Sequence, residues 1–282
     1  ISDRTTMPQL IELPTSLRFL RRASFPRKLG ILERLFGKKL ANCGTCWVRC
    51  SNGVEWKLDL TDATQRWIVY GDYEGSAFLS WMRKWMKPGG VYIDSGANIG
   101  QMLLYLAPLS NVRVIAFEPL PDAAQWLKEC VVHNPATWQV TLVNKGLFSH
   151  RSNIDLQRDG ARSTMRQDWY QNKALDMVSV PVDTLDHQLD ELGIDHVRLW
   201  KLDVEGMEVE ALQGAEQSLK QSAVDALVVE VCPPNFRKVR TLLNNARYRL
   251  FQLDKHGRLR QPPADLHSTT NLLALSSMVS TS

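Results

Sequence analysis

Residues 91–100 read VYIDSGANIG and are the most informative stretch of the chain. Its first residues are apolar and predict a buried strand that ends at Asp94. Gly96 and Gly100 then predict a turn, followed by a helix that begins near Ile99. A strand, a glycine-containing turn and a helix N-terminus together form a cradle of nucleotide size.

The spacing within this turn distinguishes two kinds of nucleotide. A dinucleotide-binding turn has the pattern G-x-G-x-x-G, in which bare backbone amides meet a pyrophosphate. Here the pattern is D-x-G-x-N-x-G, and the carboxylate of Asp94 would repel a phosphate. S-adenosylmethionine (SAM) has no phosphate and carries a cationic amine and a sulfonium. We therefore predict that Asp94, Gly96, Asn98 and Gly100 bind SAM; a turn without a ligand is the alternative.

A second acidic residue follows the next predicted strand. Residues 112–117 read VRVIAF and precede Glu118 and Pro119. An acid at the end of the second strand is placed to accept hydrogen bonds from both ribose hydroxyls of a nucleotide. Because this feature suits NAD as well as SAM, it leaves a dinucleotide oxidoreductase open. Asp94 is the residue that favours SAM.

Five segments together resemble the FkbM family of SAM-dependent methyltransferases. They are VYIDSGANIG, VIAFEP at 114–119, VPVDTLD at 180–186, KLDVEGMEVEALQGAE at 201–216 and LVVEV at 227–231. The resemblance implies an α/β fold, the Rossmann-like class I methyltransferase fold, with a seven-stranded, mostly parallel sheet and an antiparallel last strand. It also implies methylation of a sugar, glycolipid or other natural product, mostly on a hydroxyl.

The rest of the chain is consistent with alternating strands and helices. Helices are expected at about residues 99–107, 122–131, 207–220 and 235–246. We expect an N-terminal segment at 1–90, made of basic helices, a β-hairpin and a cap helix, and a methyltransferase domain at 91–282. The alternation breaks at about 146–182, where polar turns separate short strand-like runs and predict an inserted hairpin or flap.

In a parallel sheet, ligands bind beyond the carboxyl ends of the strands. Besides the residues named above, this edge is expected to hold Gly146, Asp203, Glu205 and Glu230. A sulfonium needs little activation, so the protein must mainly align the acceptor and remove its proton. We predict that Asp203 borders the methionine end of SAM and the acceptor, and that Glu205 or Glu230 orients or deprotonates the acceptor. The alternatives are that Glu205 caps the next helix, or that the three acids hold magnesium.

The resemblance adds candidates outside this edge. Tyr73 and Glu74 match a Tyr-Glu pair of the family and are expected to close over SAM, although an acid near a helix start also has a structural role. Ser163 and Thr164 lie in the insertion and resemble the family's flap, which is expected to cover the acceptor; a surface turn is the alternative. His150, where the insertion begins, is a further candidate to approach the acceptor.

Composition and charge narrow the class of protein. The 282 residues are 44% hydrophobic and 23% charged, as in an ordinary globular protein. No apolar run is long enough to span a bilayer, and no secretory signal is recognised, so cytoplasmic residence is expected. The net charge of +4 is uneven, because residues 17–40 hold eight Lys or Arg against Glu33 alone. Apolar residues interleave with these cations, which suits solvated helices, a peripheral contact with an anionic membrane, or a partner protein. No basic groove with spaced aromatics follows, so nucleic acid is not expected.

Three of the five cysteines, Cys43, Cys46 and Cys50, form a C-x-x-C-x-x-x-C cluster. This order is the reverse of a radical-SAM cluster, and no fourth ligand lies nearby. The segment alternates as a β-hairpin around Asn52-Gly53, so reduced thiols on a hairpin are expected in place of a metal site.

The sequence thus predicts a methyltransferase that uses SAM, releases S-adenosylhomocysteine (SAH) and needs no metal. Its acceptor is expected to be a small molecule, a glycan or a peptide. Two alternatives stay open: methylation of a peptide or amine nitrogen, and a SAM-binding domain without catalysis.

Overall fold

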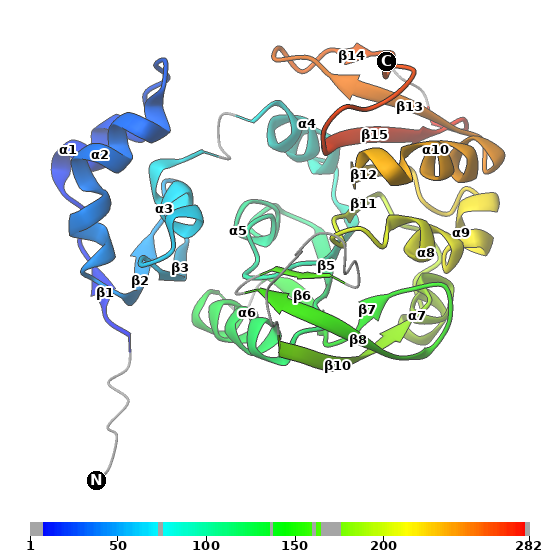
Figure 1. Ribbon diagram of the computed structural model, residues 1–282, viewed down its shortest axis with the longest axis horizontal. Coiled ribbons are helices and arrows are strands. Elements are labelled where there is room, and N and C mark those ends of the chain that lie inside the picture. The colour runs from blue at the N-terminus through cyan, green and yellow to red at the C-terminus, as the bar shows by residue number, and fades with distance from the viewer. Residues whose placement is uncertain (1–7, 73–75, 136–137, 160–161, 165–175, 280–282) are drawn as a thin grey trace, which may run out of the picture. The chain divides into compact units, whose positions relative to one another are not determined.

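A computed structural model describes residues 8–72, 76–135, 138–159, 162–164 and 176–279 of the chain (Figure 1). Contacts between residues divide the chain into two compact units. The larger unit comprises residues 81–127 and 138–282, and the smaller comprises residues 1–80 and 128–137. Each unit is described by itself.

The larger unit is built on an eight-stranded sheet in the order β14-β13-β15-β12-β11-β4-β5-β6. Its strands are β4 (Gly90–Ser95), β5 (Val112–Phe117), β6 (Gln139–Val143), β11 (Leu199–Leu202), β12 (Ala226–Val231), β13 (Tyr248–Leu253), β14 (Leu259–Arg260) and β15 (Thr270–Ser276). Neighbouring strands from β6 to β12 pair in parallel, and β15 is antiparallel to both β12 and β13. The predicted class I methyltransferase fold is confirmed, with the two-residue β14 as an additional edge strand.

Helices connect these strands and supply much of the core. They are α4 (Ala77–Met86), α5 (Leu103–Leu106), α6 (Pro121–His133), α7 (Leu185–Leu192), α8 (Glu208–Gln213), α9 (Glu216–Lys220), a 3₁₀ turn (Pro233–Asn235) and α10 (Phe236–Asn245). α8 contacts β12, α10 contacts β13, and the two helices also contact each other. α5 contacts β5. Ile93, Ile115, Trp200, Leu227 and Leu272 come from five neighbouring strands and are buried in one hydrophobic core. Strands buried on both faces explain why these segments are almost continuously apolar.

Two predicted helices are shorter than expected. The helix predicted at 99–107 is regular only over α5, because Asn98 has a φ of 50° and Gly100 a φ of 84°, which no α-helix contains. The helix predicted at 207–220 is divided into α8 and α9. It divides at Gly214, where a Cβ would lie 1.9 Å from the carbonyl oxygen of Phe148. The second difference arises from a contact between segments that are distant in sequence.

The chain between Gly146 and Asp183 contributes a second sheet to the larger unit. Its strands are β7 (Gly146–Leu147), β8 (Ser152–Asp159), β9 (Arg162–Thr164) and β10 (Asp176–Asp183), in the order β7-β10-β8-β9. β8 and β10 form a long antiparallel pair, and β10 also pairs in parallel with β7. Leu156, Val180 and Val182 give this sheet an apolar face that packs with Phe148 and Met207.

Over its described residues, the smaller unit contains the helices α1 to α3, a small sheet and the end of α6. Its elements are β1 (Leu10–Ile11), α1 (Thr15–Leu20), α2 (Lys28–Ala41), β2 (Thr45–Arg49), β3 (Glu55–Asp59) and α3 (Ala63–Tyr70). The hairpin of β2 and β3 follows the predicted alternation, with Cys46, Val48 and Cys50 buried on one side. All five cysteines are free thiols. Among the residues described, no helix has the length and apolar character needed to cross a membrane.

Candidate active site

Four neighbouring strands bring acidic residues to one edge of the main sheet. Asp94 lies near the end of β4, Glu118 directly follows β5, Asp203 directly follows β11 and Glu230 lies near the end of β12. These strands are parallel and adjacent in the order β12-β11-β4-β5, so their carboxyl ends share an edge. The sequence predicted these acids at this edge; the sheet order shows which of them are neighbours.

The glycine turn after β4 is held between the two neighbouring strands. The amides of Gly96 and Ala97 both donate to the carbonyl oxygen of Phe117, each at 3.0 Å. On the other side, the amide of Asp203 donates to the carbonyl oxygen of Ser95 at 3.1 Å. Gly96 has a φ of 76°, and a Cβ there would lie 1.8 Å from the carbonyl oxygen of Asp203. Glycine is therefore required at residue 96 by conformation and by space.

Glu118 is almost fully buried, with 6% of its surface exposed. Its Oε2 accepts a hydrogen bond from the amide of Asn98 at 2.8 Å, and its Oε1 accepts one from the amide of Leu120 at 2.9 Å. Burial raises the pKa of Glu118 to about 7, although these two hydrogen bonds oppose the shift. The side chain thus fastens the glycine turn, and the carboxylate oxygens keep lone pairs for further donors.

Lys201 is a site residue that the sequence argument did not single out. It lies opposite Asp94 in the pairing of β11 with β4, and its side chain is only 13% exposed. Its Nζ lies 2.8 Å from Asp203 Oδ2 and 3.8 Å from Asp94 Oδ1. Burial lowers the pKa of Lys201, but the charges of Asp203 and Asp94 outweigh burial and raise it above its usual range. Lys201 is therefore a buried cation among carboxylates.

Asp94 has 1% of its surface exposed, and burial raises its pKa while the charge of Lys201 opposes the shift. Its Oδ1 is buried and accepts no hydrogen bond from the residues that the structure describes. The Lys201 ammonium pairs with this oxygen at 3.8 Å, which is beyond hydrogen-bond distance, so the hydrogen bonding of the buried carboxylate is incomplete. A cationic amine is the kind of group that would complete the hydrogen bonding of this oxygen, so the residue fits a SAM site.

Glu230, Asp203 and Glu205 meet where β12 and β11 end. Burial and the charge of Asp203 raise the pKa of Glu230 to about 8, the charge of Lys201 opposes this shift, and the charge of Glu205 adds to it. Glu205 has a φ of 50° and is followed by Gly206 with a φ of 101°. Two successive residues with positive φ form a sharp turn between β11 and α8.

Another buried acid, Glu208, holds this turn in place. Its Oε1 accepts a hydrogen bond from the amide of Gly206 at 2.8 Å. The side-chain amide of Asn235 donates both to Glu208 Oε2 at 2.7 Å and to the carbonyl oxygen of Gly206 at 2.8 Å. Glu208 belongs to the quoted E-G-x-E block, but its partner Asn235 is distant in sequence. Only the folded chain shows that it positions the turn.

The remaining predicted residues lie in several places. Gly146 begins β7, and a Cβ there would lie 3.6 Å from Pro119, so these two are neighbours. The exposed His150 packs edge-on to Phe148, with ring centroids 5.3 Å apart, and its Nδ1 lies 3.1 Å from Ser149 Oγ. The backbone of Ser163 and Thr164 belongs to β9 of the second sheet. Tyr73 and Glu74 lie outside the described residues.

The chain is similar to known methyltransferases. The family model described as the methyltransferase FkbM domain matches residues 94–250. Among solved structures, the chain is similar to the methyltransferase FkbM from Methylobacillus flagellatus KT, at 19% identity and a TM-score of 0.44, covering 66% of this chain and 43% of that chain. It is also similar to magnesium protoporphyrin IX methyltransferase from Synechocystis PCC 6803 with bound SAM, at 13% identity and a TM-score of 0.44, covering 76% of this chain and 83% of that chain.

A third similar structure is a SAM-dependent O-methyltransferase from Thermotoga maritima, at 14% identity and a TM-score of 0.39, covering 72% of this chain and 64% of that chain. No curated protein matches the chain. The chain spans less than half of the Methylobacillus protein. The family model, by contrast, begins at Asp94 and includes Glu118, Lys201, Asp203 and Glu230, so it covers the whole cluster of acids. The chain belongs to the FkbM family of methyltransferases.

Proposed function

We propose that this protein transfers a methyl group from SAM to a hydroxyl of a sugar, glycolipid or other natural product. The observation that carries the proposal is the cluster of Asp94, Asp203 and Glu230 around the buried Lys201 at the carboxyl edge of the sheet. SAM supplies an electrophilic methyl group on a sulfonium. The residues of the chain must then hold the cofactor, align the acceptor and receive its proton.

Asp94 and Glu118 are the residues proposed to hold SAM. The buried Oδ1 of Asp94 suits the cationic amine of the methionine end. Glu118 lies one strand further along the edge, where a ribose would be reached, and its carboxylate is already oriented by the amides of Asn98 and Leu120. The absence of a side chain at Gly96 lets the turn approach the backbone of Asp203 closely.

Glu230 is the residue proposed to receive the proton of the acceptor. A base works best when its pKa is close to the working pH, and the pKa of Glu230 is raised to about 8. Asp203 lies between Lys201 and Glu230, and the ammonium of Lys201 compensates the negative charge of Asp203. In the alternative in which the acids hold magnesium, the metal ion would supply a positive charge at this place. Lys201 already supplies one, which supports a mechanism without a metal.

Binding of SAH tests the cofactor part of the proposal without knowledge of the acceptor. Asp94→Asn removes the negative charge of a fully buried carboxylate and should weaken SAH binding at least about ten-fold, because a charge-assisted hydrogen bond is worth about 1.5–3 kcal/mol. Asp183→Asn is the matched control, since Asp183 is equally buried but pairs with Lys145 at 3.0 Å in the second sheet. Calorimetry should show normal SAH binding for this control. Normal SAH binding by a folded Asp94→Asn protein would disprove the assignment.

Turnover tests the catalytic part. Release of SAH from SAM is measured with a panel of hydroxylated sugars and glycolipids, and methylated products are identified by mass spectrometry. Glu230→Gln should lower the rate by about 10²–10⁴-fold while SAH binding stays intact, as expected for loss of a general base. Glu205→Gln gives the comparison: if it alone stops turnover, Glu205 and not Glu230 is the base. Methylation confined to amines or peptide nitrogen would refute the hydroxyl acceptor, and SAH binding without turnover on any acceptor would favour a non-catalytic domain.

A further inference from the structure

The helices α1 and α2 of the smaller unit expose large apolar side chains to solvent. Phe19 is 83% exposed, Leu35 is 61% exposed and Ile31 is 43% exposed. Ile31 and Leu35 are one turn apart and lie on the solvent side of α2, whereas Leu32 and Leu40 of the same helix are buried. α2 therefore carries apolar side chains on its outer as well as its inner face, and the core of the unit explains only those of the inner face.

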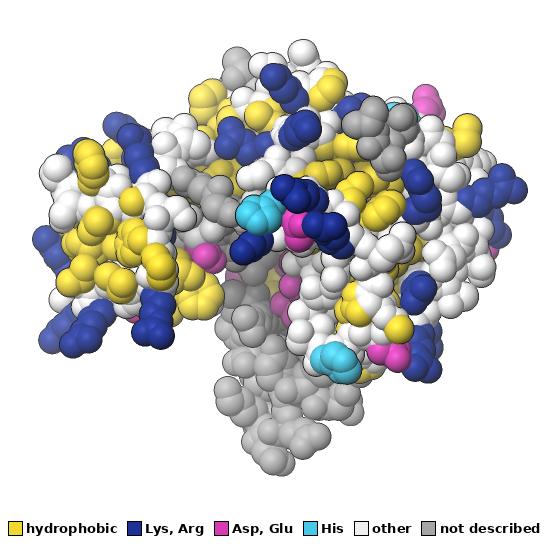
Figure 2. All heavy atoms as spheres, turned by 90° about the horizontal axis from the view of Figure 1, so that it is seen from above, with side chains coloured by type: hydrophobic (Ala, Val, Ile, Leu, Met, Phe, Trp, Pro, Cys, Tyr) yellow, Lys and Arg dark blue, Asp and Glu magenta, His cyan; other side chains and the backbone are white. Residues whose placement is uncertain are grey.

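Uncompensated positive charge accompanies these apolar side chains. Five exposed cations of α1, α2 and the loop between them form no ion pair with any residue that the structure describes: Arg22, Arg27, Arg34, Lys38 and Lys39. The one acid of this segment, Glu33, is used internally. It accepts hydrogen bonds from the guanidinium of Arg66 and from the hydroxyl of Tyr70. Figure 2 shows hydrophobic side chains bordered by Lys and Arg on this part of the surface.

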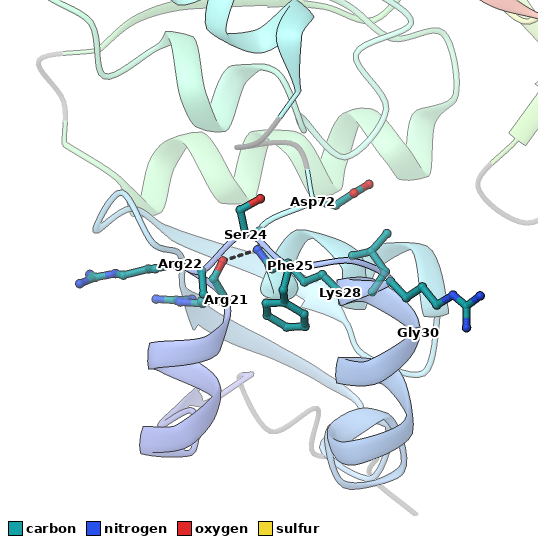
Figure 3. Close-up of a pocket in the computed structure, with 11 residues that line it drawn as sticks. Arg21, Arg22, Ser24, Phe25, Lys28, Gly30 and Asp72 are labelled. Carbon is teal, nitrogen blue, oxygen red and sulfur yellow. Dashed lines mark hydrogen bonds between the residues drawn. The ribbon is translucent and has the colours of Figure 1, made fainter. Parts of the chain in front are cut away.

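A cationic cavity of about 510 Å³ lies where α1 ends and α2 begins (Figure 3). Arg21, Arg22, Arg27 and Lys28 line it, and among the residues described Asp72 is the one acid in its wall. The Lys28 ammonium donates a hydrogen bond to the carbonyl oxygen of Arg21, and the Arg21 guanidinium donates one to the carbonyl oxygen of Arg49 at 3.1 Å. These bonds hold the cationic wall in position, and the size and charge of the cavity suit a phosphodiester headgroup.

We propose that this surface, defined by Phe19, Ile31, Leu35 and the five exposed cations, docks the protein on an anionic phospholipid membrane. The apolar side chains enter the boundary between headgroups and acyl chains, and the cations lie at the level of the phosphates. The cavity receives the phosphate of one headgroup. This inference does not depend on the methyl-transfer reaction.

Charge complementarity identifies the occupant. Each Lys or Arg near an anionic leaflet is attracted to it, so the five exposed cations together supply a substantial part of a membrane affinity. A soluble polyanion would use the cations but would gain nothing from exposing Phe19 and Leu35 to water. A lipid surface uses both kinds of side chain at once, because its phosphates and its acyl chains lie within a few ångströms of each other.

Flotation of the full chain with vesicles tests the proposal. We expect binding to vesicles that contain phosphatidylglycerol in phosphatidylcholine, weaker binding at high salt, and little binding to pure phosphatidylcholine. Phe19→Ser/Leu35→Ser should weaken binding at least about ten-fold, because burial of apolar surface is lost. Its control is Val132→Ser/Met278→Ser, which alters two equally exposed apolar residues elsewhere and should bind normally.

Charge reversal at Arg22, Arg34 and Lys38 to Glu should abolish binding to the anionic vesicles. The matched control reverses three other exposed cations, at Lys84, Lys238 and Lys255, and should retain most of the binding. All variants should bind SAH like the wild type, which separates loss of docking from loss of the enzyme's fold. The proposal is wrong if the wild type does not float with anionic vesicles, or if the apolar variant floats as well as the wild type. It is also wrong if poly-glutamate binds the wild type and the apolar variant equally well and displaces both completely from the vesicles. That result would indicate an acidic protein partner.

Discussion

Replacement of Lys201 by Met tests the electrostatic organisation of the acidic edge most directly. The ammonium lies 2.8 Å from Asp203 Oδ2 and 3.8 Å from Asp94 Oδ1, and it is almost fully buried. Methionine keeps most of the length and apolar stem of the side chain but removes the charge. The folded variant would then hold Asp94 and Asp203 close together with no cation between them.

The expected loss in the free energy of unfolding depends on how deeply Asp94 and Asp203 are buried. Breaking a buried ion pair by removing one partner costs about 3–5 kcal/mol, because the other charge stays buried and uncompensated. Asp94 is fully buried, but the side chain of Asp203 is 30% exposed and is partly screened by solvent. We therefore expect the lower end, about 3 kcal/mol, which corresponds to a decrease of about 6–12 °C in the melting temperature of a domain of this size.

The loss of stability in Lys201→Met should depend on pH. Without Lys201, the pKa values of the neighbouring carboxyl groups rise in the folded protein, so the folded variant takes up protons that the unfolded chain does not. The stability deficit of Lys201→Met should therefore be largest at about pH 8 and should shrink towards about pH 5, as these groups become protonated. Urea unfolding followed by tryptophan fluorescence at several pH values measures this difference.

Lys201→Arg is the control, because it keeps the charge. Any loss of stability in this variant comes from packing and should be nearly the same at both pH values. Lys201 does not organise the charges of this edge if Lys201→Met is as stable as the wild type at about pH 8, or if the stability deficit of the variant does not change with pH.

Two further predictions concern the glycine turn and Glu118. Gly96→Ala should abolish SAH binding and lower stability, because the new Cβ would lie 1.8 Å from the carbonyl oxygen of Asp203. Gly257 has a similar φ but open space around it, so Gly257→Ala should lower the free energy of unfolding by only about 1 kcal/mol, as measured by thermal unfolding. Affinity for SAH should rise as the pH increases to about 7, by up to about ten-fold per pH unit below that value, because the ribose hydroxyls bind the ionised form of Glu118. Glu118→Gln should weaken binding and remove this pH dependence, as measured by calorimetric titration.

Each of these predictions has a contradicting result. Equal effects of Gly96→Ala and Gly257→Ala would show that backbone conformation alone, and not contact with Asp203, requires glycine after β4. SAH affinity that is independent of pH in the wild type would show that Glu118 does not bind the ribose in its ionised form.

The local sequence was sufficient for most of the main sheet. Short, nearly continuous apolar runs predicted the strands, and the glycine turn together with the alternation of strands and helices predicted where helices lie. Asp94 and Glu118 were predicted at strand ends because a residue's place along its own strand is a local property. The same holds for the hairpin that buries Cys46 and Cys50, where alternation assigns each side chain to a face.

The tertiary structure decided what the local pattern does not contain. The role of Lys201 depends on β11 lying next to β4, and the division of the predicted helix at Gly214 depends on Phe148, which belongs to another segment. Asn235 likewise reaches Glu208 from a separate turn. Sequence periodicity specifies which face a side chain occupies, but contacts and pKa shifts depend on which segments become neighbours. The amino-acid sequence was thus enough to predict the class of fold and the acids at the edge of its sheet. The buried cation among those acids could be placed only in the folded chain, because the order of strands in a sheet is set by packing across the whole domain.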